Sequence, residues 1–195
     1  RMHFSGPGGH AGAVLMKDRH DPLLPAAHVV LAIDQAARSI GGEDTVATCG
    51  VVQVHPGAIN SIPRQVTLEI DVRDILVDRR QRVLEQITTL AEDAANEHGC
   101  QFRLEWINCD DPAQGDDRIV QAIEAACQKC GYSVQRMISR AYHDSLFMAR
   151  ICPTSMIFIP CYQGISHRPE EFASLEAIGK GVEVLAETLL QLANL

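Results

Sequence analysis

Strand-like and helix-like segments alternate in a fixed order over residues 1–109, and this order limits the folds that the chain can adopt. Short segments with a two-residue apolar period predict strands, and longer segments with apolar residues every three or four positions predict helices. The predicted order is strand, helix, strand, strand, helix, strand, over 1–5, 21–42, 45–54, 64–75, 78–99 and 100–108. This is the order of the split β-α-β, ferredoxin-like fold, in which both helices cover one face of an antiparallel sheet.

A different pattern follows the polar, turn-rich stretch CDDPAQGDD, so we place a domain boundary between residues 109 and 110. Beyond it the sequence predicts helices at 117–130, 142–150 and 174–193 and strands at 133–138 and 154–160. This alternation is typical of a sheet covered by helices on both faces. Two strands cannot complete such a sheet, so their partners would come from another part of the protein or from another molecule. We therefore expect an α/β (α+β) chain with two domains, 1–109 and 110–195.

Composition excludes several classes of function. Seventeen basic and twenty-five acidic residues give a net charge of −8, which disfavours binding to nucleic acids or anionic membranes. No apolar stretch approaches the roughly 20 residues of a membrane span. Seven cysteines, an odd number, indicate reduced thiols, and the CxxC pair Cys127 and Cys130 lies in a predicted helix, buried or idle, with a redox or metal role as the alternative. We expect a soluble intracellular protein with a small-molecule or protein partner.

His10 lies in the stretch SGPGGHAGAVLM, where glycines at 6, 8, 9 and 12 leave the backbone bare. Glycine allows positive φ and a close approach of a ligand to the main chain, so the histidine is presented and not packed. The alternative is a flexible loop after an edge strand with an incidental histidine.

Two further candidates lie in the second half of the chain. His167 follows a predicted buried strand in GISHRPEEFAS, a position suited to a metal ligand or general base, with a surface histidine in a turn as the alternative. His143 and Asp144 open a predicted helix, where backbone amides can hold an anion or carboxylate. Alternatively, Asp144 is only a first-turn residue that favours the helix.

The last candidates are Asn60, in the loop PGAIN, and Arg73, in the predicted strand EIDVRDI. An arginine within a half-buried strand costs stability unless an anion or an acid satisfies it. The acid could be Asp71 or Asp74, which would make the arginine structural. No serine-hydrolase elbow, Walker loop or HExxH motif is present, so those chemistries are not expected.

Taken together, five motifs occur in a fixed order: GGHAG, PGAINSIP, DVRD, AYHDSLFMAR and GISHRPEEF. They resemble the second half of the amidohydrolases that act on N-carbamoyl compounds, a family of dinuclear metallohydrolases of the aminoacylase and carboxypeptidase type. The family includes N-carbamoyl-L-amino acid hydrolases, ureidoglycolate amidohydrolases and allantoate deiminases. The resemblance covers essentially the whole chain.

This resemblance implies different tasks for the two domains. Residues 1–109 would be a ferredoxin-like lid and dimerisation domain, and residues 110–195 the closing portion of a catalytic α/β domain. The family's other metal ligands and its glutamate general base stand before the lid, so the chain is expected to be the second half of a longer protein and inactive alone. A homodimer is implied, in the cytoplasm of a bacterium or the endoplasmic reticulum of a plant.

The resemblance also implies a role for each candidate. His167 matches one ligand of two divalent ions, manganese preferred and zinc possible, which lower the pKa of a bound water. His10 matches a lid histidine that enters the active site of the partner subunit and hydrogen-bonds the oxyanion. The residues expected to contact substrate are Asn60 and Arg73, which would grip a carboxylate, and His143 and Asp144, which line the catalytic domain.

The wording of YHDSLFMAR and MIFIPCYQGISH is most similar to the allantoate deiminases. The leading expectation is hydrolysis of allantoate to ureidoglycine with release of ammonia and carbon dioxide, in purine and ureide catabolism. An N-carbamoyl-L-amino acid or ureidoglycolate is the alternative substrate. Leu15 stands where the family often has proline, and Arg140–Tyr142 replaces small residues before the His-Asp pair, a departure that suits the allantoate branch. From another class, the alternative is a non-catalytic module that dimerises or binds a small anion.

Overall fold

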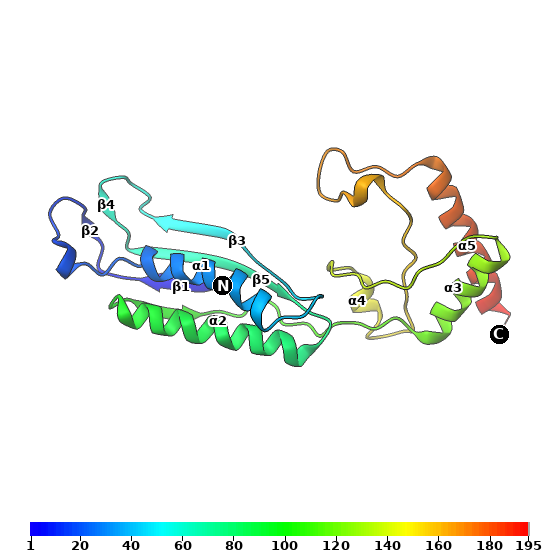
Figure 1. Cartoon of the computed structure of the whole chain (residues 1–195), viewed down its shortest axis with the longest axis horizontal. Coiled ribbons are helices and arrows are strands. Elements are labelled where there is room, and N and C mark those ends of the chain that lie inside the picture. The colour runs from blue at the N-terminus through cyan, green and yellow to red at the C-terminus, as the bar shows by residue number, and fades with distance from the viewer. Residues whose placement is uncertain (195) are drawn as a thin grey trace. The chain divides into compact units, whose positions relative to one another are not determined.

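The computed structural model describes residues 1–194, which fall into two compact units (Figure 1). The first unit spans Arg1–Pro112 and the second begins at Ala113, just after the boundary placed from the sequence. The chain has the mixed α/β content that was predicted. None of the helices in residues 1–194 combines the length and the apolar character that a membrane span requires.

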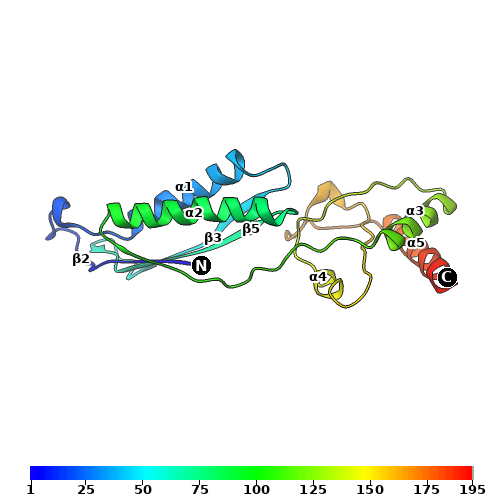
Figure 2. The same cartoon turned by 90° about the horizontal axis from the view of Figure 1, so that it is seen from below.

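The first unit consists of an antiparallel sheet and two long helices. Its main elements are β1 (Met2–Ser5), α1 (Leu23–Ser39), β3 (Val46–His55), β5 (Gln65–Arg73), α2 (Val77–Glu97) and β6 (Gln101–Leu104). The strands lie in the order β3-β5-β1-β6, and each neighbouring pair is antiparallel. Figure 2 shows α1 and α2 on the same side of this sheet.

The core of the first unit lies between the sheet and the two helices. Alternate strand residues face the core, so Met2 and Phe4 are buried, while His3 and Ser5 lie on the opposite face. The ring of Phe4 lies 5.2 Å from that of Phe102 on β6. The other large core side chains are Val29, Ile33, Val66, Leu68, Val83 and Ile87. Each such burial contributes about 1.5–3 kcal/mol, which makes this layer the main source of the unit's stability.

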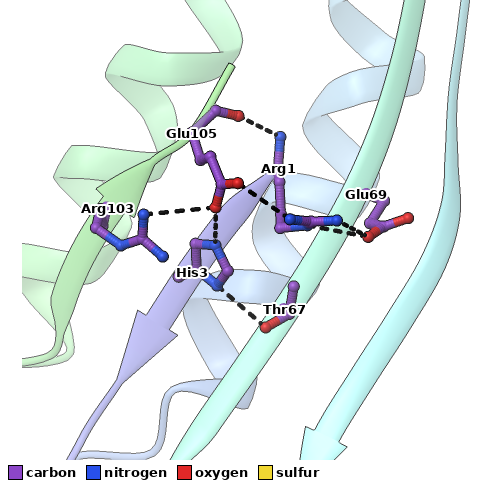
Figure 3. Close-up of polar contacts among 6 residues, drawn as sticks. All are labelled: Arg1, His3, Thr67, Glu69, Arg103 and Glu105. Atoms are coloured by element: carbon purple, nitrogen blue, oxygen red, sulfur yellow. Dashed lines mark hydrogen bonds and ion pairs between the residues drawn. The ribbon is translucent and has the colours of Figure 1, made fainter. Parts of the chain in front are cut away.

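The outer face of the sheet carries a polar network (Figure 3). Its members are Arg1, His3, Thr67, Glu69, Arg103 and Glu105. Glu105 accepts from Arg1 at 3.1 Å and lies 3.0 Å from Nε2 of His3, and Arg1 also donates to Glu69 at 2.7 Å. These contacts link β1 to the strands on both of its sides. Because the charged groups are partly exposed, the network adds little to stability and mainly keeps this face polar.

A second, two-stranded sheet joins β2 (Gly9–His10) to β4 (Ser61–Ile62), and a short 3-10 helix, η1 (Met16–Asp18), follows β2. The sequence predicts a turn-rich loop over 55–63. The structure differs at Ser61 and Ile62, which form β4 and pair with β2. A run of two residues is too short to show an apolar period, so pattern alone could not reveal this pairing.

The second unit contains α3 (Asp117–Lys129), α4 (Ser145–Met148), a short 3-10 helix, η2 (Tyr162–Gly164), and α5 (Leu175–Ala193). Side chains cap the two long helices, since Asp116 accepts from the amide of Arg118 at 3.0 Å and Ser174 from that of Ala177 at 3.1 Å. The predicted helices at 117–130 and 174–193 are confirmed. The helix predicted at 142–150 is reduced to α4.

The segments predicted as strands at 133–138 and 154–160 are not strands among the described residues of the second unit, where no β-ladder occurs and the partners expected from elsewhere are not present. Extended backbone forms a strand only where a neighbour pairs with its amides and carbonyls. The apolar run at 154–160 is used for packing instead. Ile157 packs against the cluster that Ala126, Cys127 and Val184 form between α3 and α5.

Candidate functional site

His10 and Asn60 are brought together by the two-stranded sheet. His10 lies opposite Ser61 in the antiparallel pairing of β2 with β4. The amide of Ala11 then donates to the carbonyl of Asn60 at 2.9 Å. The loop that carries His10 is therefore hydrogen-bonded to a second loop, which argues against the flexible-loop alternative.

Two glycines allow this close pairing. Gly8 has a φ of 68° and Gly9 a φ of 147°, both in the range that side chains disfavour. A Cβ on Gly8 would lie 2.4 Å from Cγ of Arg64. The glycine-rich stretch thus serves to close the loop against the chain before β5, and it leaves the ring of His10 exposed.

The His10 ring is held by its own loop. The amide of Gly12 donates to Nδ1 of His10 at 3.0 Å. The guanidinium of Arg19 donates to the carbonyls of Val14, at 3.1 Å, and Ala11. The sequence did not reveal that Gly12 and Arg19 hold this loop. A backbone donor and a side chain that bonds main-chain carbonyls leave no sequence motif.

Arg73 lies at the far end of β5 from the Asn60 loop. The eight residue steps from Gln65 to Arg73 correspond to about 26 Å of strand. Arg73 pairs with Asp71 (Nε–Oδ2 2.8 Å), and this hydrogen bond raises the pKa of Arg73. Of the two acids that the sequence left open as its partner, the structure places Asp71 beside it. One copy of the first unit therefore does not bring Asn60 and Arg73 to the same point.

Asp74 belongs to a separate, buried cluster at the same end of β5. Its side chain is 0% exposed and accepts from Arg79 (Nε–Oδ2 2.6 Å), the hydroxyl of Thr45 and the amide of Leu76 at 2.8 Å. Burial by itself raises the pKa of Asp74, but the hydrogen bonds from Arg79, Thr45 and Leu76 outweigh it and lower the pKa from 3.8 to about 2. The cluster fixes the turn that leads from β5 into α2, and the sequence pattern had not singled it out.

In the second unit, His143 lies beside Ser139 and Phe158. Its Nε2 is 2.6 Å from the hydroxyl of Ser139, and its ring meets that of Phe158 edge-on at 5.8 Å. Asp144 is the N-terminal cap position of α4, where its carbonyl accepts from the amide of Phe147 at 3.0 Å and its side chain makes no cap bond. Both residues are thus held at the start of a short helix, as their position in the sequence suggests.

His167 lies in a turn before α5. Its φ of 58° is unusual for a residue with a side chain, and its amide donates to the carboxylate of Glu171 at 2.8 Å. A metal site needs three or more protein ligands, and within residues 1–194 no group of three His, Cys, Asp or Glu side chains is placed to hold an ion. The described residues therefore do not fit a metal centre by themselves.

Two hollows of the first unit do not include the candidate residues. One of about 430 Å³ is lined by Ser5, Gly6, His55, Arg64, Gln65 and Gln101. A larger one of about 660 Å³ lies around β6 and includes His3, Cys100 and Arg103. Neither is lined by His10, Asn60 or Arg73. These three side chains lie at the surface of the unit.

Known proteins are similar to this chain over the region that contains the five motifs. The model of Peptidase family M20/M25/M40 matches residues 8–191. Ureidoglycolate hydrolase from Oryza sativa subsp. japonica is 48% identical over 99% of this chain and 40% of its own length. N-carbamoyl-L-amino acid amidohydrolase from Geobacillus stearothermophilus is 38% identical (100% and 47% covered), and allantoate amidohydrolase from Bacillus subtilis is 30% identical (97% and 46%).

A solved structure agrees with these relatives. The crystal structure of AtUAH in complex with (S)-hydroxyglycine matches with a TM-score of 0.91 and 47% identity, over 98% of this chain and 45% of that chain. The chain spans about 40 to 47% of the length of the curated relatives named above. Because the family model covers nearly all of the described residues, the chain belongs to peptidase family M20/M25/M40.

Proposed function

We propose that this chain forms part of a hydrolase of ureido C–N bonds, with ureidoglycolate as its first candidate substrate. The observation that carries the proposal is the 48% identity, along 99% of the chain, to a protein named ureidoglycolate hydrolase. The sequence motifs favoured allantoate, but the allantoate amidohydrolase is only 30% identical to this chain. Ureidoglycolate therefore ranks before allantoate as the candidate substrate. N-carbamoyl amino acids are the third candidate, on 38% identity.

The proposed reaction consumes one water for each ureidoglycolate. The ureido carbonyl carbon leaves as carbon dioxide and its terminal nitrogen as ammonia, and the remaining amine is hydroxyglycine. AtUAH has been crystallised with (S)-hydroxyglycine and with glyoxylate, which are both small carboxylates. A carboxylate of this kind suits the guanidinium of Arg73, whose planar fork can bond both oxygens.

His10 would stabilise charge during this reaction. Attack of water on the ureido carbonyl places negative charge on its oxygen, and a hydrogen-bond donor aimed at that oxygen lowers the barrier. The exposed ring of His10, with Nδ1 already bonded to Gly12, can offer Nε2 to such an oxygen. Asn60, in the loop paired with that of His10, would contact the same substrate.

The separation of Asn60 and Arg73 supports a homodimer. The two ends of β5 lie about 26 Å apart, which is more than a small substrate can bridge. Both residues reach one carboxylate only if they come from two subunits. The first unit would then be the ferredoxin-like lid and dimerisation domain, an assignment that agrees with the strand order β3-β5-β1-β6. Exposed Leu24 and Leu31 on α1 are suitable contact residues for a second copy.

The second unit would be the closing portion of the catalytic domain, with His143 and Asp144 near the substrate and His167 as a metal ligand. The two divalent ions stay a prediction. The described residues do not fit a metal centre by themselves.

An assay of the full-length protein tests the substrate. Ammonia release is measured with manganese added, from ureidoglycolate, allantoate and an N-carbamoyl amino acid in parallel. The highest kcat/KM is expected with ureidoglycolate. Turnover of allantoate alone would restore the first ranking, and turnover of none of the three would contradict the whole proposal.

A non-catalytic module that dimerises or binds a small anion is the second candidate. Equilibrium dialysis of the full-length protein against manganese separates the two. A dinuclear enzyme retains about two ions per subunit, whereas a lone histidine retains hardly any.

A further inference from the structure

The hydrogen bond from Gly12 to His10 determines which ring nitrogen carries the proton. A backbone amide can only donate, so Nδ1 of His10, 3.0 Å from the amide of Gly12, must accept. A neutral imidazole has one N–H, and with Nδ1 as acceptor that hydrogen stands on Nε2. The tautomer of His10 is therefore set by the main chain two residues further on.

The loop is built so that this bond persists. The amides of Ala13 and Val14 both donate to the carbonyl of His10, at 3.0 and 3.2 Å, and close a turn around Gly12. The part-buried guanidinium of Arg19 spans the turn by donating to Ala11 and Val14. The pairing with β4 holds the other side of the loop. Backbone and side chain together keep the amide of Gly12 beside Nδ1 of the ring.

We propose that Gly12, through its amide, and Arg19, through its two carbonyl contacts, are positioning residues that hold His10 as a neutral, outward-facing Nε2–H donor. A donor fixed before the reaction needs no reorganisation when negative charge develops, which is the condition for effective stabilisation of an oxyanion. The tautomer follows from the loop alone. Its value for catalysis rests on the proposed function.

The tautomer can be measured without any activity. In protein labelled with ¹⁵N-histidine, long-range ¹H–¹⁵N spectra at about pH 9 distinguish the two nitrogens of each of the eight histidines, and His10→Gln identifies the signal of His10 by its loss. The unmodified protein is expected to show His10 in the Nε2–H form. A dominant Nδ1–H form would overturn the proposal directly.

A matched pair of variants tests the amide itself. Gly12→Pro removes the N–H, whereas Gly12→Ala keeps it, and a Cβ there would make ordinary contacts of 3.4 and 3.5 Å with the ring. Losing one hydrogen bond is expected to shift the tautomer ratio of His10 about fivefold toward Nδ1–H in the proline variant only. Should that variant not fold, Arg19→Met leaves the amide in place but loosens the turn, and a smaller shift in the same direction is expected. An unchanged ratio in both refutes the role of the loop.

Kinetics of the full-length protein with ureidoglycolate give the second readout. Gly12→Pro is expected to lower kcat much more than Gly12→Ala does, with similar KM values, because the donor acts on the transition state. If the tautomer shifts but kcat does not, the catalytic part of the proposal fails. If the unmodified full-length protein turns over no substrate, the proposed function fails while the tautomer result stands.

Discussion

Asp74 offers the sharpest test of how much a buried charge contributes to the free energy of unfolding. The substitution is Asp74→Asn. The carboxylate is fully buried and receives hydrogen bonds from Arg79, Thr45 and the amide of Leu76. An amide keeps the shape of the side chain but removes its negative charge and one acceptor position. The variant therefore isolates the charge from the packing.

The magnitude follows from the pKa of Asp74. That pKa lies at about 2, against an ordinary value of 3.8. One pKa unit corresponds to about 1.4 kcal/mol, so the ionised carboxylate contributes about 2 kcal/mol to the free energy of unfolding at neutral pH. Because the folded state has the lower pKa, this contribution is complete above about pH 4 and is lost as the pH falls toward 2. Asp74→Asn is expected to cost at least this amount at pH 7.

Urea unfolding at pH 7 and at several values down to pH 2 measures the effect. Trp106, the one tryptophan of the chain, follows β6 in the first unit and reports its unfolding by fluorescence. The control is Asp71→Asn on the same strand, which removes the exposed pair with Arg73 and is expected to cost less than about 1 kcal/mol. The reasoning is refuted if the two variants cost the same, or if the gap between Asp74→Asn and the unmodified protein does not narrow below pH 4.

Three further outcomes are expected. Phe4→Ala leaves a cavity in the core of the first unit and should cost about 3–5 kcal/mol in the same urea assay, and a loss below 1 kcal/mol would contradict the core assignment. In α5, Gly181→Ala should lower the thermal midpoint, because a Cβ would lie 2.6 Å from Cγ2 of Ile159, whereas Gly179→Ala, which meets no atom within 4 Å, should raise it by improving helix propensity. His10→Ala should reduce kcat of the full-length protein at least tenfold with little change in its unfolding midpoint, since the ring is exposed, and equal rates would exclude its role as a donor.

Local pattern was sufficient for the elements that contain their own signal. The helices at 117–130 and 174–193 carry cap residues and an apolar stripe within a single segment, so they could be read directly. The same holds for the order of strands and helices in the first unit, because each strand alternates apolar and polar residues against one core. The segments expected as strands at 133–138 and 154–160 form no ladder among the described residues, because a strand also needs a neighbour and apolar character does not supply one.

The candidate site shows the same division. The residue types and their order along the chain sufficed to single out His10, Asn60, Arg73 and His167 and to match them to a family. Which groups meet was decided by long-range pairing: β2 with β4 joins the loops of His10 and Asn60, and the direction of β5 separates Asn60 from Arg73.

The sequence by itself therefore determined the kind of elements, their order and the chemistry available. Tertiary structure alone decided that Arg73 pairs with Asp71 while Asp74 is buried with Arg79, and that Gly12 holds the ring of His10. The physical reason is that apolar periodicity and capping depend on neighbours along the chain, whereas the partner of a charged or polar group depends on distances that only the folded backbone sets.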